Sequence, residues 1–412
     1  MSSYSIIILL CGLVIFSYLF DIFAKKTKIP AVLLLLATGV GLRFLADALN
    51  FPGIDFSTLL PILGTIGLIL IVLEGALELH FTPEKKQVIL KSLGAAFFLL
   101  IGSSLAIGYL FMYITEAPFK TCLLNAVPYS TISSAIAIPS VANLMASKKE
   151  FIVYESTFSD ILGIMFFNFL LYNEQISAGS FFGLSVEIVL ILFLAAVFSF
   201  FLLYLLGRIT HHIKFFLILA ILVLIYAVGK QFHLSTLIII LIFGLFLNNT
   251  QLIDFEWFKK HFEYKNLGKD LQQLHILTAE SAFLIRTFFF IVFGFTMELG
   301  NLSNLPTLAN GLATVAFIYI LRWLYLRFAA KVELKPEVAV SPRGLISILL
   351  FFSIPSTARL WGIDNSLLLF VILATSLVMT IGLMRVKAQT PSELGQEATF
   401  DEEVEEVFSE KD

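Results

Sequence analysis

The sequence predicts an all-α polytopic membrane protein of about thirteen transmembrane helices, from its composition, its apolar runs and the placement of its charges. Of its 412 residues, 58% are hydrophobic and 14% are charged, whereas a soluble domain is usually about 25% charged. The apolar residues recur in runs of roughly 20, the length that crosses a bilayer as a helix. The predicted spans cover residues 5–23, 30–48, 57–80, 89–114, 118–145, 152–172, 182–208, 213–229, 234–249, 271–299, 308–329, 338–359 and 366–386.

The positive charges alternate between the two sides of the membrane that this helix count defines. With the N-terminus outside, the inside loops hold 17 of the 27 Lys and Arg residues and the outside loops hold 3. Because Lys and Arg collect in cytoplasmic loops, we expect an external N-terminus and a cytoplasmic C-terminus. The bias also supports the helix count, since one missed helix would invert every later loop. We place this multi-pass protein in the plasma membrane, the inner membrane of a bacterium.

The composition changes sharply near the C-terminus. A transmembrane domain of thirteen helices is predicted over residues 1–386, and residues 387–412 form an acidic tail. A segment this polar cannot bury a core, so we expect the tail to be disordered in the cytoplasm.

Several classes of function find no support in the sequence. No basic stripe suggests a nucleic-acid partner, and the six histidines show no metal-ligand spacing. Cys11 and Cys122 lie in or beside apolar runs and are interpreted as small hydrophobic residues. We find neither the Gly-x-Ser-x-Gly turn of a hydrolase nor paired aspartates of Gly-x-Gly-Asp type. We therefore predict that the protein is not an enzyme and uses no cofactor.

Two predicted spans, the fifth and the twelfth, share a short pattern. Pro128-Tyr-Ser-Thr-Ile-Ser133 resembles Pro342-Arg-Gly-Leu-Ile-Ser347, and an Ile-Pro-Ser triplet follows each, at 138–140 and 354–356. Proline lacks an amide donor and clashes with the preceding turn, so we expect both helices to break at corresponding places. Paired interrupted helices in the two halves of a chain are typical of a transporter binding site. The alternative is two ordinary proline kinks with a chance match.

Asp160 is the first candidate for function, because it lies in an otherwise apolar span and a charge at membrane depth is costly. A buried carboxyl group can hold a proton near neutral pH, since burial disfavours its charged form. The same oxygens can hold a small cation, for which hydroxyl and carbonyl oxygens are further ligands. Ser156 lies one helical turn before Asp160, and the backbone near Thr131 supplies carbonyls where the broken helix unwinds. The alternative is a structural Asp that is permanently protonated or paired.

Glu155 is about 140° around the helix from Asp160, so the two carboxylates are not expected to share one ion. We expect Glu155 to face a basic partner, and Arg343 in the second broken helix is the natural candidate. Glu280 and Arg286 in the tenth predicted span join this charge network. Ion pairing that only supports the scaffold explains the network equally well.

A second pair of acids, Glu74 and Glu78, lies at the inner end of the third predicted span. At a spacing of four residues they share a helix face and would repel each other if both were charged. We expect one to line an ion path and the other to lie at its cytoplasmic mouth. The alternative is that they extend to the membrane interface, which suits Glu78 better.

Four of these patterns resemble those of monovalent cation:proton antiporters of the sodium/proton exchanger (NhaP/NHE-like) type. The resemblance covers about residues 5–386. Each motif is weak alone, but four in the right order on the right helices are fairly specific. They are Leu73-Glu74-Gly-Ala-Leu-Glu78-Leu on the third helix, Glu155-Ser156-x-x-Ser159-Asp160 in place of Glu-Ser-x-x-Asn-Asp, the stretch 280–294 on the tenth helix, and Arg343-Gly344.

The resemblance implies two inverted six-helix repeats, two broken helices that cross, and a homodimer in the lipid bilayer whose core domain moves against a dimerisation domain. It implies that Asp160 is the carboxylate that binds Na⁺ or K⁺ in exchange for H⁺, and that this exchange serves pH homeostasis. Ser156, Ser159, the Thr131 backbone and Glu74 would be ion-site ligands or water holders, with Asp160, Ser156 and Thr131 on the transported cation. Arg343 would steady Glu155 and the crossing.

Two positions depart from the family pattern. Ser159 stands where the family has Asn, and Thr131-Ile132-Ser133 stands where it has Thr-Asp-Pro. One carboxylate remains at the exchange point, so we predict electroneutral exchange of one cation per proton. The departures leave the choice between Na⁺, K⁺ and Li⁺ open, and they favour the first alternative, a membrane sensor or scaffold that does not transport. An organic-anion symporter on a similar scaffold is the second alternative, although its cavity would need more polar groups.

Overall fold

The computed structural model describes residues 3–27, 29–49, 59–79, 85–142, 144–173, 178–209, 214–232, 234, 236–250, 256, 267–297 and 304–385. These residues are almost entirely helical and include no strand. The predicted acidic tail, 387–412, lies outside them.

Each of the thirteen predicted spans contains a helix, which confirms the predicted fold class. Nine described helices are long and apolar enough to cross a membrane, and the protein is a multi-pass membrane protein. The helices are α1 (Ser3–Thr27), α2 (Ala31–Ala48), α3 (Leu59–Glu78), α4 (Lys86–Thr115), α5 (Phe119–Ser130), α6 (Ser134–Ser140), α7 (Ala146–Tyr172), α8 (Ala178–Arg208), α9 (Lys214–Gln231), α10 (Leu237–Asn248), α12 (Leu267–Thr296), α13 (Leu305–Leu324), α14 (Leu345–Phe352) and α15 (Asn365–Met384).

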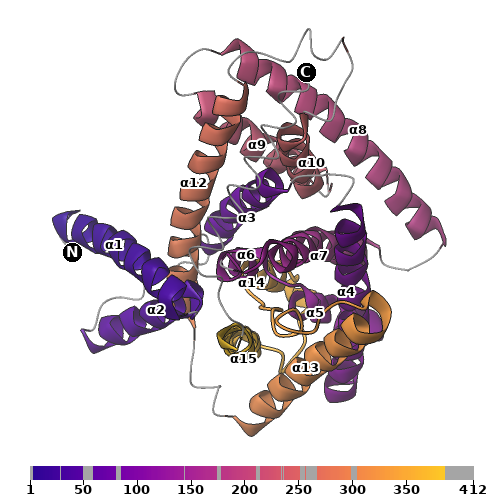
Figure 1. Cartoon of the computed structure of the whole chain (residues 1–412). Coiled ribbons are helices and arrows are strands. Elements are labelled where there is room, and N and C mark those ends of the chain that lie inside the picture. The colour runs from indigo at the N-terminus through magenta and orange to yellow at the C-terminus, as the bar shows by residue number, and fades with distance from the viewer. Residues whose placement is uncertain are drawn as a thin grey trace.

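The helices gather into two groups (Figure 1). In the first, which we call the broken-helix bundle, α4, α5, α6 and α7 pack with α13, α14 and α15. In the second, the α12 bundle, α12 packs on α2 and α3, α10 packs on α3 and α8, α9 contacts α3 and α8, and α1 lies at the edge against α2. The two bundles meet where α3 contacts α6, α7 and α14.

Small residues on α3 let the bundles approach closely. A Cβ atom at Gly64 would overlap Leu349 Cδ2 of α14, and one at Gly75 would lie 3.3 Å from Thr157 Oγ1 of α7. Glycine leaves room for a neighbouring helix that a larger side chain would hold away. This contact places α3, and the acids near its inner end, directly against the broken helices.

The fifth span breaks between its two prolines rather than at either of them. Pro128 lies inside α5 and Pro139 inside α6, while residues 131–133 between them are not helical. Thr131 and Ser133 have extended conformations, with ψ of 128° and 113°. Proline weakens the helix by removing one amide donor, and the break falls where side chains of other segments bind the freed backbone.

The twelfth span is less helical than the sequence predicts. Its helix, α14, has eight residues and begins after Gly344, whereas the prediction covers 338–359. The chain before it, 331–344, consists of turns and irregular backbone. The two interruptions contact each other, since the Ser133 amide donates to the Pro342 carbonyl at 2.9 Å. Both spans are therefore interrupted, but the prediction that they break at corresponding places is wrong, because residues 345–347, which match 131–133 in the shared pattern, are helical.

Candidate functional site

Asp160 lies where α7 passes the interruption between α5 and α6, and it is 1% exposed. Its Oδ2 accepts hydrogen bonds from the amide of Ser134, at 3.3 Å, and from the Ser134 hydroxyl. Its Oδ1 is buried and accepts no hydrogen bond from the described residues. Buried polar atoms are almost always paired, so this oxygen is the natural position for a proton or a cation.

The side chains of Ser159 and Thr131 bind the backbone at the interruption. Ser159 Oγ accepts the Ile132 amide at 2.9 Å, and Thr131 Oγ1 donates to the Val127 carbonyl at 3.0 Å. The side chain of Thr131 also packs on Gly163 of α7, where a Cβ atom would lie 2.7 Å from its Cγ2. Both side chains therefore bind backbone groups at the interruption, and Thr131 can offer an ion its carbonyl and the acceptor lone pairs of its hydroxyl.

Ser156 lies one turn before Asp160 and is fully buried, and its hydroxyl donates to the Val153 carbonyl at 3.2 Å. Donation to the backbone still leaves a hydroxyl two acceptor lone pairs. Three further hydroxyl groups near the two interruptions are buried and have no hydrogen-bond partner in the described structure; they belong to Ser133, Thr157 and Ser347. The sequence analysis assigned no site role to these residues or to Ser134. For Ser133 and Ser134 the density of hydroxyls before Pro139 was the available signal.

Arg343 is buried and binds backbone rather than a carboxylate. Its guanidinium donates to the carbonyls of Tyr129, at 2.7 Å, and Ser130, at 3.1 Å. It also donates to Ser341, at 2.9 Å to the carbonyl and 2.5 Å to the hydroxyl. The carbonyls at the C-terminal end of a helix lack helical donors and carry partial negative charge. Arg343 therefore stabilises the end of α5 at the interruption.

The partner of Glu155 is Arg322, and the predicted pairing with Arg343 is wrong. Arg322 donates from Nη1 and Nη2 to the two Glu155 oxygens at 2.6 and 2.7 Å, and both side chains are 1% exposed. Its Nε donates to the Glu337 carbonyl at 2.8 Å. A two-point contact of this kind is the strongest geometry for this pair. Arg322 lies well inside a predicted span, away from the loops that hold most of the Lys and Arg residues, which was a usable signal.

The other predicted members of the charge network, Glu280 and Arg286, do not join Glu155 and Arg343 in one cluster. Arg286 Nη1 donates to the Ala135 carbonyl in the first turn of α6 at 2.8 Å. Glu74 is partly buried on α3, within electrostatic reach of Arg286 and Glu78. Glu280 is exposed on α12. The four predicted members therefore do not form one cluster, and Arg286 is the one that reaches the broken helix beside Asp160.

A cavity of about 650 Å³ lies between the ends of α3, α4, α7, α10 and α12. Its polar lining includes Glu78 and His275, and an ion pair joins Lys85 to Glu150 at 2.7 Å. The lining reaches Tyr154 of α7, which is about 9 Å along the helix from Asp160. The lining comes from helix ends next to predicted inside loops.

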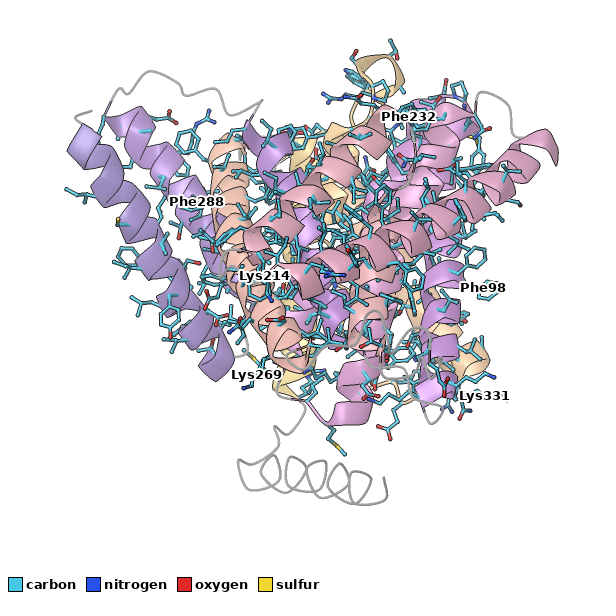
Figure 2. All side chains as sticks on the ribbon, turned by 90° about the horizontal axis from the view of Figure 1, so that it is seen from above. Phe98, Lys214, Phe232, Lys269, Phe288 and Lys331 are labelled. Carbon is cyan, nitrogen blue, oxygen red and sulfur yellow. The ribbon has the colours of Figure 1, made fainter. Side chains whose placement is uncertain are left out.

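The positions of other residues fit this orientation. Figure 2 shows Lys269 and Lys331, from two predicted inside loops, at one end of the helices, and Phe232, from a predicted outside loop, at the opposite end. The cavity therefore opens toward the side predicted to be cytoplasmic.

Two interrupted helices that meet beside a buried carboxylate in a multi-pass helical fold are typical of secondary transporters. The chain belongs to the sodium/hydrogen exchanger family, whose transmembrane family model matches residues 8–386. This confirms the predicted family. Because the family consists of transporters, the protein is not an enzyme.

Two solved structures share the fold. Both are of the sodium proton antiporter MjNhaP1 from Methanocaldococcus jannaschii, one of them at pH 8. The first is 19% identical, covers 93% of this chain and 96% of its own, and has a TM-score of 0.68. The second is 21% identical, covers 92% of this chain and 95% of its own, and has the same TM-score of 0.68. No curated protein matches the sequence.

Proposed function

We propose that the protein exchanges a monovalent cation, Na⁺ or K⁺, for a proton by alternating access, with Asp160 as the exchanging carboxylate. The observation that carries this proposal is the buried, unpaired Oδ1 of Asp160 beside the interruption. Ser134 fixes the other oxygen of the carboxylate. One group that binds either a proton or a cation, and never both, is sufficient for exchange. The name of the family and the sodium proton antiporter fold support this activity.

Further ligands for the cation are available close to Asp160. The carbonyl of Thr131 at the interruption and the hydroxyl of Ser156 are hard oxygen donors of the kind that an alkali cation binds. Ile132 is buried where the related antiporters are expected to have a carboxylate, and Ser159 uses its oxygen on the Ile132 amide. Asp160 is then the one carboxylate that binds a proton in one step and a cation in the other. We therefore propose that one cation is exchanged for one proton, so that exchange is electroneutral.

The cavity and the acids of α3 support a route from Asp160 to the cytoplasmic side. Glu78 lines the cavity, and Glu74 lies one turn deeper on α3. Movement of the broken-helix bundle against the α12 bundle would expose Asp160 to each side in turn. We further propose that residues 1–386 form this transport unit in the plasma membrane, as a homodimer, with the acidic tail in the cytoplasm.

The test is proton flux in proteoliposomes after addition of Na⁺, K⁺ or Li⁺, with the membrane potential clamped. Wild-type protein should move protons in response to a cation, and Asp160→Asn should abolish the response. Asp47→Asn is the matched control, because Asp47 is exposed and pairs with Arg43 on α2. Exchange by Asp160→Asn at the wild-type rate would remove Asp160 from this role. No cation-dependent flux from the wild type would favour a sensor or scaffold, and flux driven by an organic anion would favour a symporter.

A further inference from the structure

Arg286 joins the two bundles. It belongs to α12, yet its Nη1 donates to the Ala135 carbonyl of α6 in the broken-helix bundle at 2.8 Å. Other charged pairs connect residues of the same bundle: Lys85–Glu150, Lys148–Glu333, Lys214–Asp270 and Arg322–Glu155. If the bundles move against each other, those pairs can persist, whereas the contact of Arg286 with Ala135 must break.

The contact lies in the turn of α6 that holds Asp160. Ala135 follows Ser134, which donates both its amide and its hydroxyl to the Asp160 carboxylate. α6 has seven residues and starts directly after the interruption. Because the first turn of such a short helix moves as a unit, a guanidinium bound to Ala135 also fixes the donors of Asp160.

A second partner for Arg286 lies within its own bundle. Glu74 on α3 is attracted by the Arg286 charge. The two helices are in contact, since a Cβ atom at Gly67 would lie 3.1 Å from Ile285 Cγ2. Glu74 is two turns from Gly67 toward the cavity. Side chains on a helix tilt toward its N-terminus, and the first residues of α12 line that cavity. The Arg286 side chain is therefore inclined toward Glu74.

We propose that Arg286 is a positioning residue that exchanges partners during the transport cycle. It binds the Ala135 carbonyl in the arrangement described here, and it binds Glu74 when the broken-helix bundle has moved. This inference rests on the alternating access proposed above. Through Arg286 the α12 bundle then contacts the helix turn that binds Asp160. The amide and hydroxyl of Ser134 are fixed in the arrangement described here and are free to move in the other.

The test measures the two arrangements without measuring transport. Spin labels at Tyr113→Cys and Phe232→Cys, on exposed positions of α4 and of the end of α9, report the distance between the bundles in full-length protein whose native cysteines are replaced. Singly labelled samples identify distances between protomers. Loss of a charged hydrogen bond should change the ratio of the two distance populations by about tenfold or more.

Glu74→Gln should enrich the population that matches this structure, because it removes the partner of the other arrangement and leaves the contact of Arg286 with Ala135 intact. Arg286→Gln removes both contacts, so in its background Glu74→Gln should no longer shift the ratio. Arg286→Lys, which keeps a charged donor, should retain most of the wild-type ratio. Arg43→Gln is the control, because Arg43 donates to the Phe295 carbonyl within the α12 bundle. An unchanged ratio in Glu74→Gln, or the same shift by Glu74→Gln with and without Arg286→Gln, would overturn the proposal. The Asp160→Asn flux result tests the exchange activity separately.

Discussion

Removal of Arg322 should destabilise the protein strongly, because it leaves Glu155 charged and buried. The pair is bidentate, at 2.6 and 2.7 Å, and each side chain is 1% exposed. Removal of one partner of such a pair usually costs about 3–5 kcal/mol. With about 2.1 cal/mol/K of unfolding entropy per residue, a chain of 412 residues that unfolds as one unit loses about 1.2 °C in Tm per kcal/mol. Arg322→Met should therefore lower the apparent Tm by about 4–6 °C.

The measurement is thermal unfolding of the purified protein in detergent. The double variant Glu155→Gln, Arg322→Met should recover most of the loss, because it removes the buried charge together with its partner. Lys148→Met is the control, since its partner Glu333 is 75% exposed and exposed ion pairs contribute little. If Arg322→Met melted at the wild-type temperature, Glu155 would have to be protonated or solvated, and the reasoning from this geometry would be refuted.

Three further predictions concern the interruptions and the segment before α14. Ser159→Ala leaves the Ile132 amide buried without its acceptor, so thermal unfolding should show a loss of about 1–3 kcal/mol, whereas Ser159→Asn keeps an acceptor and should lose less. Arg343→Lys replaces the planar fork, whose three nitrogens bind Tyr129, Ser130 and Ser341, with one compact ammonium group, so exchange in proteoliposomes should fall well below the rate of an Arg43→Lys control. Burial raises the pKa of Glu337, so its contribution to stability is fully present below pH 4.5 and is lost as the pH rises through the raised pKa. Glu337→Gln should remove that part of the pH dependence of Tm. An unaltered pH profile of Tm would contradict the raised pKa of Glu337.

The helix count and the paired interruptions could be predicted from the sequence because both depend on local signals. Apolar run length fixes the spans, and the spacing of Lys and Arg separates them. The exact break points could not be predicted in this way. The fifth span breaks after Ser130 because Ser159, Asp160 and Pro342 bind the next amides, and those partners come from distant segments.

The partner of Glu155 shows the same limit. Sequence position favoured Arg343, because it lies in the second broken helix beside the proposed site. The structure directs that side chain onto the end of α5 and brings Arg322 from α13 to Glu155 instead. Both arginines were candidates by composition, and only the packing of α13 within the broken-helix bundle decides between them. Contacts between distant helices are therefore the part of the site that the sequence does not reveal.

The binding of Arg343 to main-chain carbonyls has a consequence for the response to voltage. The positive charge of Arg343 stays at the interruption whether Asp160 is ionised, protonated or bound to a cation. On the proposed mechanism, the proton-loaded and the cation-loaded sites carry the same total charge. Each elementary charge moved across a potential of 100 mV involves about 2.3 kcal/mol of electrical work, but this work is equal and opposite on the outward and return steps. The driving force would then come from the two concentration gradients alone, and a change in the resting potential would not alter the equilibrium that the transporter can reach.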